Sequence, residues 1–307
     1  GTSLGTFAYR VNANAVTELN LLGNFGNAFN RKAGDLYGII LLPESATGAD
    51  IEQARKLLID RGAADASTFT DVQAAWVSRS DIVEFRNTEF PSATASAYVW
   101  ENCNNMTQIN TVNAPLSNNF ASTWKGCSAL TSFPAGAKLG TEATNVNFTN
   151  AWRSSGLTSF PALDLSTGTN FTSAWRQITS LVSFEKVIFE KSNDLFAAWY
   201  ADTSLVNFAA GCFDSWNPDS LTSGIFDATW GACDSLSALS VENILVSIDA
   251  SGQYATSTGA SGGTALADAD IDIDFDTATG SLSAATNTAV TSLKAKGWSI
   301  VINGVTL

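Results

Sequence analysis

The stretch NFTSAWRQITSLVSF, residues Asn170–Phe184, decides the fold because close copies of it recur along the chain. NFASTWKGCSALTSF begins at Asn119, and NFTNAWRSSGLTSF begins at Asn147. Each copy places an apolar residue four positions before a tryptophan and further apolar residues six and nine positions after it, or five and eight positions after it in the shorter copy around Trp152. The frame recurs at successive spacings of 24, 24, 28, 23, 24 and 31 residues around Trp76, Trp100, Trp124, Trp152, Trp175, Trp199 and Trp230. A period in the twenties is typical of a solenoid.

Each repeat predicts one short helix and one short strand. A tryptophan and an apolar residue four positions earlier lie on one helix face, while LTSF and LVSF alternate as strands do. One repeat cannot bury its apolar edge alone, but stacked repeats form a continuous core. We therefore predict an α/β solenoid of about seven coils over residues 70–248. The tryptophans are expected to form a buried ladder rather than a ligand-binding stripe.

The two flanking segments are expected to cap this solenoid. Residues 1–69 contain a strand-sized apolar run at Leu36–Pro43 and then an amphipathic helix, which suits a cap or the end of an upstream lectin-like domain. Residues 249–307 contain a loop rich in Gly, Ser and Thr, followed by a capping strand, helix and strand. VENILVSID, just before the loop, is interpreted as a strand. Gly297 is expected to end the final helix.

The composition excludes several classes of function. A net charge of -13 disfavours binding to nucleic acids and to anionic membranes. The absence of histidine removes the commonest general base and imidazole metal ligand. The four cysteines form no CxxC pair, so a zinc site is not expected. No apolar run reaches the ~20 residues of a membrane span. Only 15% of residues are charged, which suits an extracellular or virion-surface location.

The repeat also resembles a known family. The frame AWxxCxxLxxF, seen here as TWKGCSALTSFP at Thr123–Pro134, resembles the BspA-like class of leucine-rich repeat. The tryptophan-rich form in LTSFPALDLSTGTNF is similar to repeats in tail-fibre and other virion proteins of marine bacteriophages, and also in bacterial surface proteins. This resemblance implies a virion structural or receptor-binding protein that contacts a host-cell glycan or protein. It also implies contacts with other virion proteins and a homotrimer.

The candidate binding residues are small polar side chains that lie between the buried positions of the repeat. Hydroxyl and amide groups on a strand face suit hydrogen bonding to a glycan. This reasoning selects Thr131, Ser132, Thr158, Ser159, Thr179, Ser180, Ser183 and Asn207.

A metal site is a second candidate. In DADIDIDFD, the side chains of Asp270, Asp272 and Asp274 share one face of a predicted strand, because side chains alternate along a strand. Hard cations such as calcium prefer carboxylate oxygens. The alternative interpretation is a solvated acidic face on a capping strand. No other cofactor is expected.

Three alternatives to a receptor-binding virion protein remain open at this point. A bacterial cell-surface adhesin would have the same repeat, and so would a capsid decoration protein. A polysaccharide-cleaving tail protein would need two carboxylates at glycosidase spacing. The chain has no P-loop, GxSxG, HExxH or dinucleotide motif, so the sequence predicts that it is not an enzyme.

Overall fold

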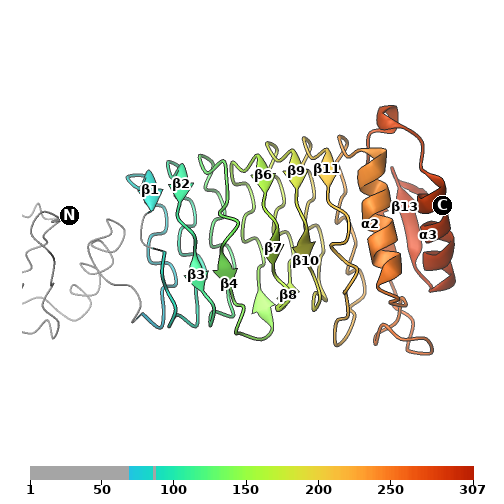
Figure 1. The fold of residues 1–307 in the computed structure, drawn as a ribbon, viewed down its shortest axis with the longest axis horizontal. Coiled ribbons are helices and arrows are strands. Elements are labelled where there is room, and N and C mark those ends of the chain that lie inside the picture. The colour runs from blue at the N-terminus through green and yellow to red at the C-terminus, as the bar shows by residue number, and fades with distance from the viewer. Residues whose placement is uncertain (1–68, 86–87) are drawn as a thin grey trace, which may run out of the picture. The chain divides into compact units, whose positions relative to one another are not determined.

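The computed structural model describes residues 69–85 and 88–307. The expected N-terminal cap, residues 1–69, therefore lies outside the described residues except for its last position. The described chain winds into a solenoid of about five turns with few helices, fewer than the about seven coils predicted. The solenoid is followed by a C-terminal group of helices and strands (Figure 1). Within the described ranges, no helix combines the length and apolar character that a membrane span requires.

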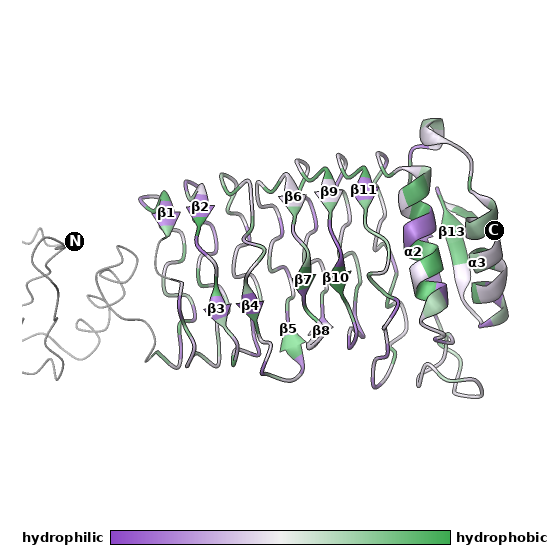
Figure 2. Cartoon of the chain, viewed as in Figure 1, coloured by the Kyte–Doolittle hydropathy of each residue, from purple (hydrophilic) through white to green (hydrophobic). Residues whose placement is uncertain are grey.

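Short parallel strands join neighbouring coils. The first set comprises β1 (Glu84–Phe85), β2 (Gln108–Ile109), β6 (Ser159–Phe160), β9 (Ser183–Phe184) and β11 (Asn207–Phe208). The second set comprises β3 (Asn113–Ala114), β4 (Lys138–Leu139), β7 (Leu163–Asp164) and β10 (Val187–Ile188). A third pair comprises β5 (Val146–Asn147) and β8 (Gly168–Asn170). Every strand pairing within these sets is parallel, as stacked coils require. Most of these strands combine one hydrophobic and one hydrophilic residue (Figure 2).

The predicted short helix around each tryptophan is wrong. Consecutive turns take its place: the Ala174 N–H donates to the Phe171 carbonyl three residues earlier at 2.9 Å. Ser173 and Gln177, two residues before and after Trp175, have positive φ angles of 55° and 63°, which is typical of the third residue of a type II turn. The same two positions have positive φ in all seven tryptophan-centred units.

The neighbouring coil explains why turns replace the helix. The N–H groups of Ser173, Trp175 and Gln177 donate to carbonyls of the next coil at 2.9 to 3.0 Å. A helix would instead direct these groups to its own carbonyls four residues back. Spacing of apolar residues at i and i+4 fits both conformations, so the pattern alone did not distinguish them.

The predicted tryptophan ladder is confirmed. Each of the seven tryptophans is at most 1% exposed. The Trp175 and Trp199 rings stack with centroids 5.0 Å apart and an interplanar angle of 3°. Phe184 meets both rings edge-on, at centroid distances of 5.0 and 5.1 Å. Stacked and edge-to-face contacts add to the energy of burying these large rings, so the ladder forms the core of the solenoid.

A helix, not the expected strand, follows the last coil. VENILVSID lies inside α2 (Ala238–Ala250), which begins after the N-cap Ser237. Ser240 Oγ accepts a hydrogen bond from Phe208 N at 2.9 Å, and Asn243 Nδ2 donates to Phe208 O at 2.8 Å. These side chains satisfy main-chain groups at the edge strand β11, which would otherwise be open to pairing with another chain.

The remaining C-terminal elements form a βαβ unit. β12 (Asp270–Ile273) pairs in parallel with β13 (Ser299–Ile302), and α3 (Ala284–Ala295) connects them after the short η1 (Thr277–Thr279). β14 (Val305–Thr306) adds an antiparallel edge. Gly297 follows α3 with a φ of 90°, which confirms the predicted helix stop. The Trp230 N–H donates to the Asp272 carbonyl at 3.3 Å, so β12 closes the last tryptophan-centred unit.

Candidate binding surface

A row of polar side chains lies along the outside of the β6–β9–β11 sheet. Ser183 is in register with Ser159 on one side and with Asn207 on the other. The next residue in each strand is a buried phenylalanine, so the row is fixed to a rigid core. We call Ser159, Ser183 and Asn207 the polar row. Parallel strands are about 4.8 Å apart, so the row repeats a hydrogen-bonding group at that interval.

Two further predicted residues extend this surface toward the N-terminus. Ser132 occupies the equivalent place in the Trp124 coil and is exposed, although that coil has no assigned strand there. Thr131, just before it, is also exposed. The Thr158 N–H donates to the Thr131 carbonyl at 3.0 Å, which joins the two coils. The structure therefore brings these residues alongside the polar row.

Thr179 and Ser180 lie in the turn before β9, not in the strand. Ser180 Oγ donates to the Leu157 carbonyl at 2.9 Å, and Thr158 Oγ1 donates to the Thr131 carbonyl at 3.2 Å. These two hydroxyl protons therefore hold adjacent coils together. The other six predicted side chains make no hydrogen bond to any described residue and are available to a ligand.

The charge along the same strand position changes at the N-terminal end of the solenoid. Glu84 in β1 and Gln108 in β2 are in register with each other at the place that Ser159 holds in its own coil. The central coils have serine or asparagine there instead. The uncharged part of this surface therefore belongs to the middle coils, which suits a neutral ligand.

The predicted calcium ligands do share a strand face. Asp270 and Asp272 are half-buried in β12, while Ile271 and Ile273 are buried on the other side. Asp274 Oδ2 accepts a hydrogen bond from Ala232 N at 2.7 Å, so that oxygen already has a partner. Among the residues that the structure describes, no group of three or more histidine, cysteine or acidic side chains is placed to hold a metal ion. The calcium site stays a prediction.

The electrostatics of β12 follow from this crowding of carboxylates. Partial burial raises the pKa of Asp272, and the negative charges of Asp274, Asp227 and Asp270 raise it further. Like charges favour the protonated form of one member of the group. A bound cation would oppose this effect.

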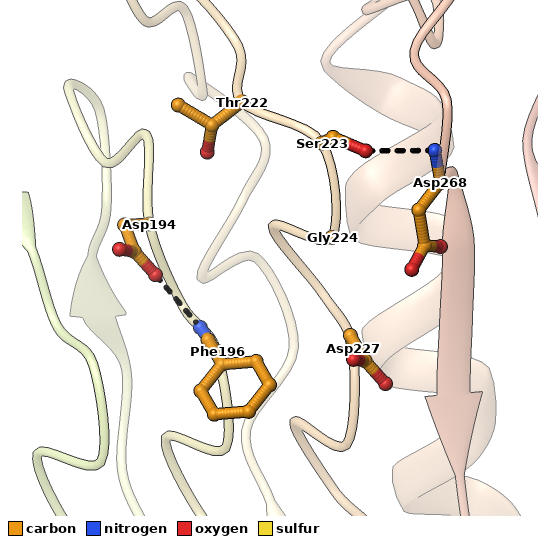
Figure 3. A pocket seen from close by; sticks show the side chains of 7 residues that line it. All are labelled: Asp194, Phe196, Thr222, Ser223, Gly224, Asp227 and Asp268. Carbon is orange, nitrogen blue, oxygen red and sulfur yellow. Dashed lines mark hydrogen bonds between the residues drawn. The ribbon is translucent and has the colours of Figure 1, made fainter.

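A shallow pocket of about 410 Å³ lies between two coils and the start of β12 (Figure 3). Asp194, Asp227 and Asp268 line it together with Phe196 and three small residues. Asp194 Oδ1 accepts from Phe196 N at 3.1 Å, and Ser223 Oγ accepts from Asp268 N at 2.8 Å. These bonds to the main chain give the lining carboxylate and hydroxyl a structural role.

The asparagine or aspartate that precedes five of the seven tryptophans has a capping role that our sequence reasoning missed. Asn170 Oδ1 accepts a hydrogen bond from Thr172 N at 2.9 Å, which caps the first turn of the coil. The recurring NF dipeptide was the available signal. The same cap, five residues before the tryptophan, is made by Asp71, Asn119, Asn147, Asn170 and Asp194.

Comparison with protein-family models, with curated proteins and with solved structures returned no match for this chain.

Proposed function

We propose that this protein is a non-enzymatic binding component of a bacteriophage virion, most simply a tail-fibre or receptor-binding part that contacts the host cell through its solenoid. The single observation that supports this proposal best is the in-register polar row, Ser159, Ser183 and Asn207. The BspA-like resemblance supplies the virion context. The finer assignment to BspA-like leucine-rich repeats is part of the same proposal.

The chemistry of the row favours a glycan as the ligand. Hydroxyl and amide groups can each donate and accept hydrogen bonds, as sugar hydroxyls do. The row is uncharged, so no charged side chain of the row has to lose its hydration when a neutral sugar binds. Its spacing is set by buried phenylalanines, so little conformational entropy is lost on binding.

A binding experiment tests the row. The protein is applied to an array of surface glycans and to whole cells, and Ser159→Ala/Ser183→Ala/Asn207→Ala is compared with it. Each lost hydrogen bond is worth about 0.5–1.5 kcal/mol, so we expect affinity to fall at least about tenfold. A matched control replaces three exposed residues elsewhere, Thr144→Ala/Ser215→Ala/Ser220→Ala, and should bind normally. Unchanged binding by the row variant would remove the proposed surface.

The location on the particle tests the virion assignment separately. Antibody labelling of intact particles should mark the tail for a receptor-binding part and the shell for a capsid decoration protein. Labelling of bacterial cells without phage would favour an adhesin. Release of reducing ends from host polysaccharide would contradict the non-enzymatic assignment. The homotrimer is checked by light scattering, which should report three times the mass of one chain.

A further inference from the structure

A second row of side chains runs along the outside of the tryptophan turns. It consists of the residue that directly follows the tryptophan in successive coils, and we call it the turn row. Main-chain bonds of 2.8 to 3.0 Å hold its members one coil apart, and the coil spacing is given by the 5.2 Å between the Trp152 and Trp175 ring centroids. The row reads Glu101, Lys125, Arg153, Arg176 and Tyr200.

Only the first cation of the turn row is neutralised by a carboxylate. Lys125 Nζ lies 2.9 Å from Glu101 Oε1. Arg153 instead donates to the neutral amide oxygen of Gln177, at 3.0 Å from Nη2 and 3.3 Å from Nε. The Arg176 guanidinium lies 4.8 Å from the centre of the Tyr200 ring. Neither arginine forms an ion pair with any carboxylate of the described residues.

Arg176 also retains unused donors at the end of its side chain. Its Nε is buried without a hydrogen-bond partner, so a ligand in solution does not reach that nitrogen. Its Nη1 and Nη2 are not among the buried atoms, and they donate to none of the described residues. The cation–π contact holds the guanidinium in place but accepts none of these protons.

Two neighbouring arginines that both lack a carboxylate partner are unexpected in this chain. The sequence contains 29 acidic and 16 basic residues, so carboxylates are plentiful. Like charges directly opposite each other on neighbouring strands repel. Arg153 and Arg176 occupy equivalent positions one coil apart and repel in the same way. An anion held between them would relieve this repulsion and accept from the exposed Nη groups of Arg176.

We propose that Arg153 and Arg176 form a binding site for a single carboxylate or sulfate group. The Nη1 and Nη2 groups of Arg176 present two parallel donors that match either oxyanion. Arg153 adds its charge, because its Nε and Nη2 already donate to Gln177 and its Nη1 donates to Asn150 Oδ1 at 3.4 Å. Gln177 and Tyr200 already hold the two side chains, so binding costs little side-chain entropy. A long polyanion is disfavoured, since the net charge of -13 repels it. The ligand class is therefore a glycan with isolated acidic groups; its identity as a glycan rests on the proposed function, whereas anion binding does not.

The test uses the full chain and three probes at constant ionic strength: sodium glucuronate, sodium sulfate and glucose. NMR spectra of ¹⁵N-labelled protein follow the arginine Nε–Hε signals. We expect saturable shifts of two of these signals with glucuronate or sulfate, and none with glucose. Arg153→Gln/Arg176→Gln should weaken binding at least tenfold, and Arg176→Lys, which keeps the charge but loses the fork, should weaken it less.

A matched control separates a specific site from a general charge effect. Lys186→Gln/Lys191→Gln makes the same change in net charge at lysines of the Trp175 coil and should bind the anions normally. Equal loss in the control, or equal shifts with glucose, would overturn the proposal, as would the absence of saturation. Far-ultraviolet circular dichroism checks that each variant is folded. Anion binding that persists in the polar-row variant would support this site even if glycan binding by that row fails.

Discussion

Asp202 Oδ1 accepts a hydrogen bond from the main-chain N–H of Ile178 at 2.7 Å, and both residues are fully buried. Asp202 lies three residues after Trp199, the position that cysteine occupies in other coils. There, Cys103 and Cys127 donate Sγ–H at 3.0 Å to the tryptophan carbonyl of the preceding coil. Burial raises the pKa of Asp202 well above its ordinary value, which favours the neutral carboxyl in the fold. Its second oxygen, Oδ2, is buried and has no hydrogen-bond partner among the described residues.

Asp202→Asn should therefore stabilise the protein, and by more at alkaline pH than at acidic pH. The folded state holds a proton on Asp202 that the unfolded chain releases above the ordinary carboxyl pKa. The stabilising contribution of this proton is complete below that pKa and is lost as the pH rises through the raised pKa. The amide is neutral at every pH. Urea unfolding at several pH values should show a free energy of unfolding that depends less on pH in the variant.

Asp234→Asn is the control, because this side chain is exposed; it lies four residues after Trp230 and directly follows Cys233. Its substitution should leave the pH dependence unchanged. A variant at Asp202 that is less stable at pH 9 than the parent would contradict a neutral buried carboxyl.

Gly156 should not tolerate a side chain. The Trp152 coil is one residue shorter than its neighbours after the tryptophan, and the chain is drawn close to the preceding coil. A Cβ at Gly156 would lie 2.1 Å from the Ser128 carbonyl oxygen. Since main chain cannot move aside as a flexible side chain can, Gly156→Ala should cost about 2 kcal/mol or more. The measurement is the midpoint of urea unfolding.

Gly136→Ala provides the matched comparison. A Cβ there would meet its nearest atom, Thr111 Cγ2, at 3.4 Å, which is ordinary contact. Its stability should change by less than about 1 kcal/mol, and alanine even lowers the entropy of the unfolded chain. Equal effects at the two glycines would show that the short coil relaxes.

Trp175 and Trp216 should respond differently to the same substitution. Both are buried, but Trp175 Nε1 has no hydrogen-bond partner in the described residues, whereas Trp216 Nε1 donates to the Ser192 carbonyl at 2.7 Å. Trp175→Phe removes an unpaired donor and should cost less than about 2 kcal/mol. Trp216→Phe leaves a buried carbonyl without its donor and should cost about 1–3 kcal/mol more.

Trp175→Ala measures the full contribution of one rung. A large aromatic removed from a core costs about 3–5 kcal/mol, and here the stacking contacts with both neighbouring rungs are lost as well. Thermal unfolding followed by tryptophan fluorescence is the measurement. If Trp175→Phe were as damaging as Trp175→Ala, the ladder would depend on the indole N–H after all.

The thiols should be unreactive in the folded protein. Burial raises the pKa of Cys103 to about 11 and that of Cys212 to about 12, and it also raises the pKa of Cys127. At pH 8 the thiolate fraction of Cys103 is then about 0.1%. All four cysteines are unbridged. Labelling with a thiol reagent should be slow until urea is added and should then reach four groups per chain. Disulfide-linked Cys103 and Cys127 in fresh protein would contradict this.

The sequence by itself determined the solenoid and its core. Repetition of the frame Phe171, Trp175, Leu181 and Phe184 every 23 to 31 residues leaves stacked coils as the way to bury all of its copies, because each coil alone has an open apolar edge. The polar positions between them could be placed outside for the same reason. The pattern therefore predicts Ser159, Ser183 and Asn207 as surface residues, although it does not give their register.

The tertiary structure alone decided how each coil is built and which side chains meet. Whether the N–H of Trp175 bonds within its own segment or to the next coil depends on a partner 23 residues away, so a helix and a pair of turns look alike in the sequence. VENILVSID became a helix because Ser240 and Asn243 could satisfy the edge of β11. The pairing of Arg153 with Gln177 and of Asp202 with Ile178 likewise depends on the stacking of coils, which no local pattern encodes.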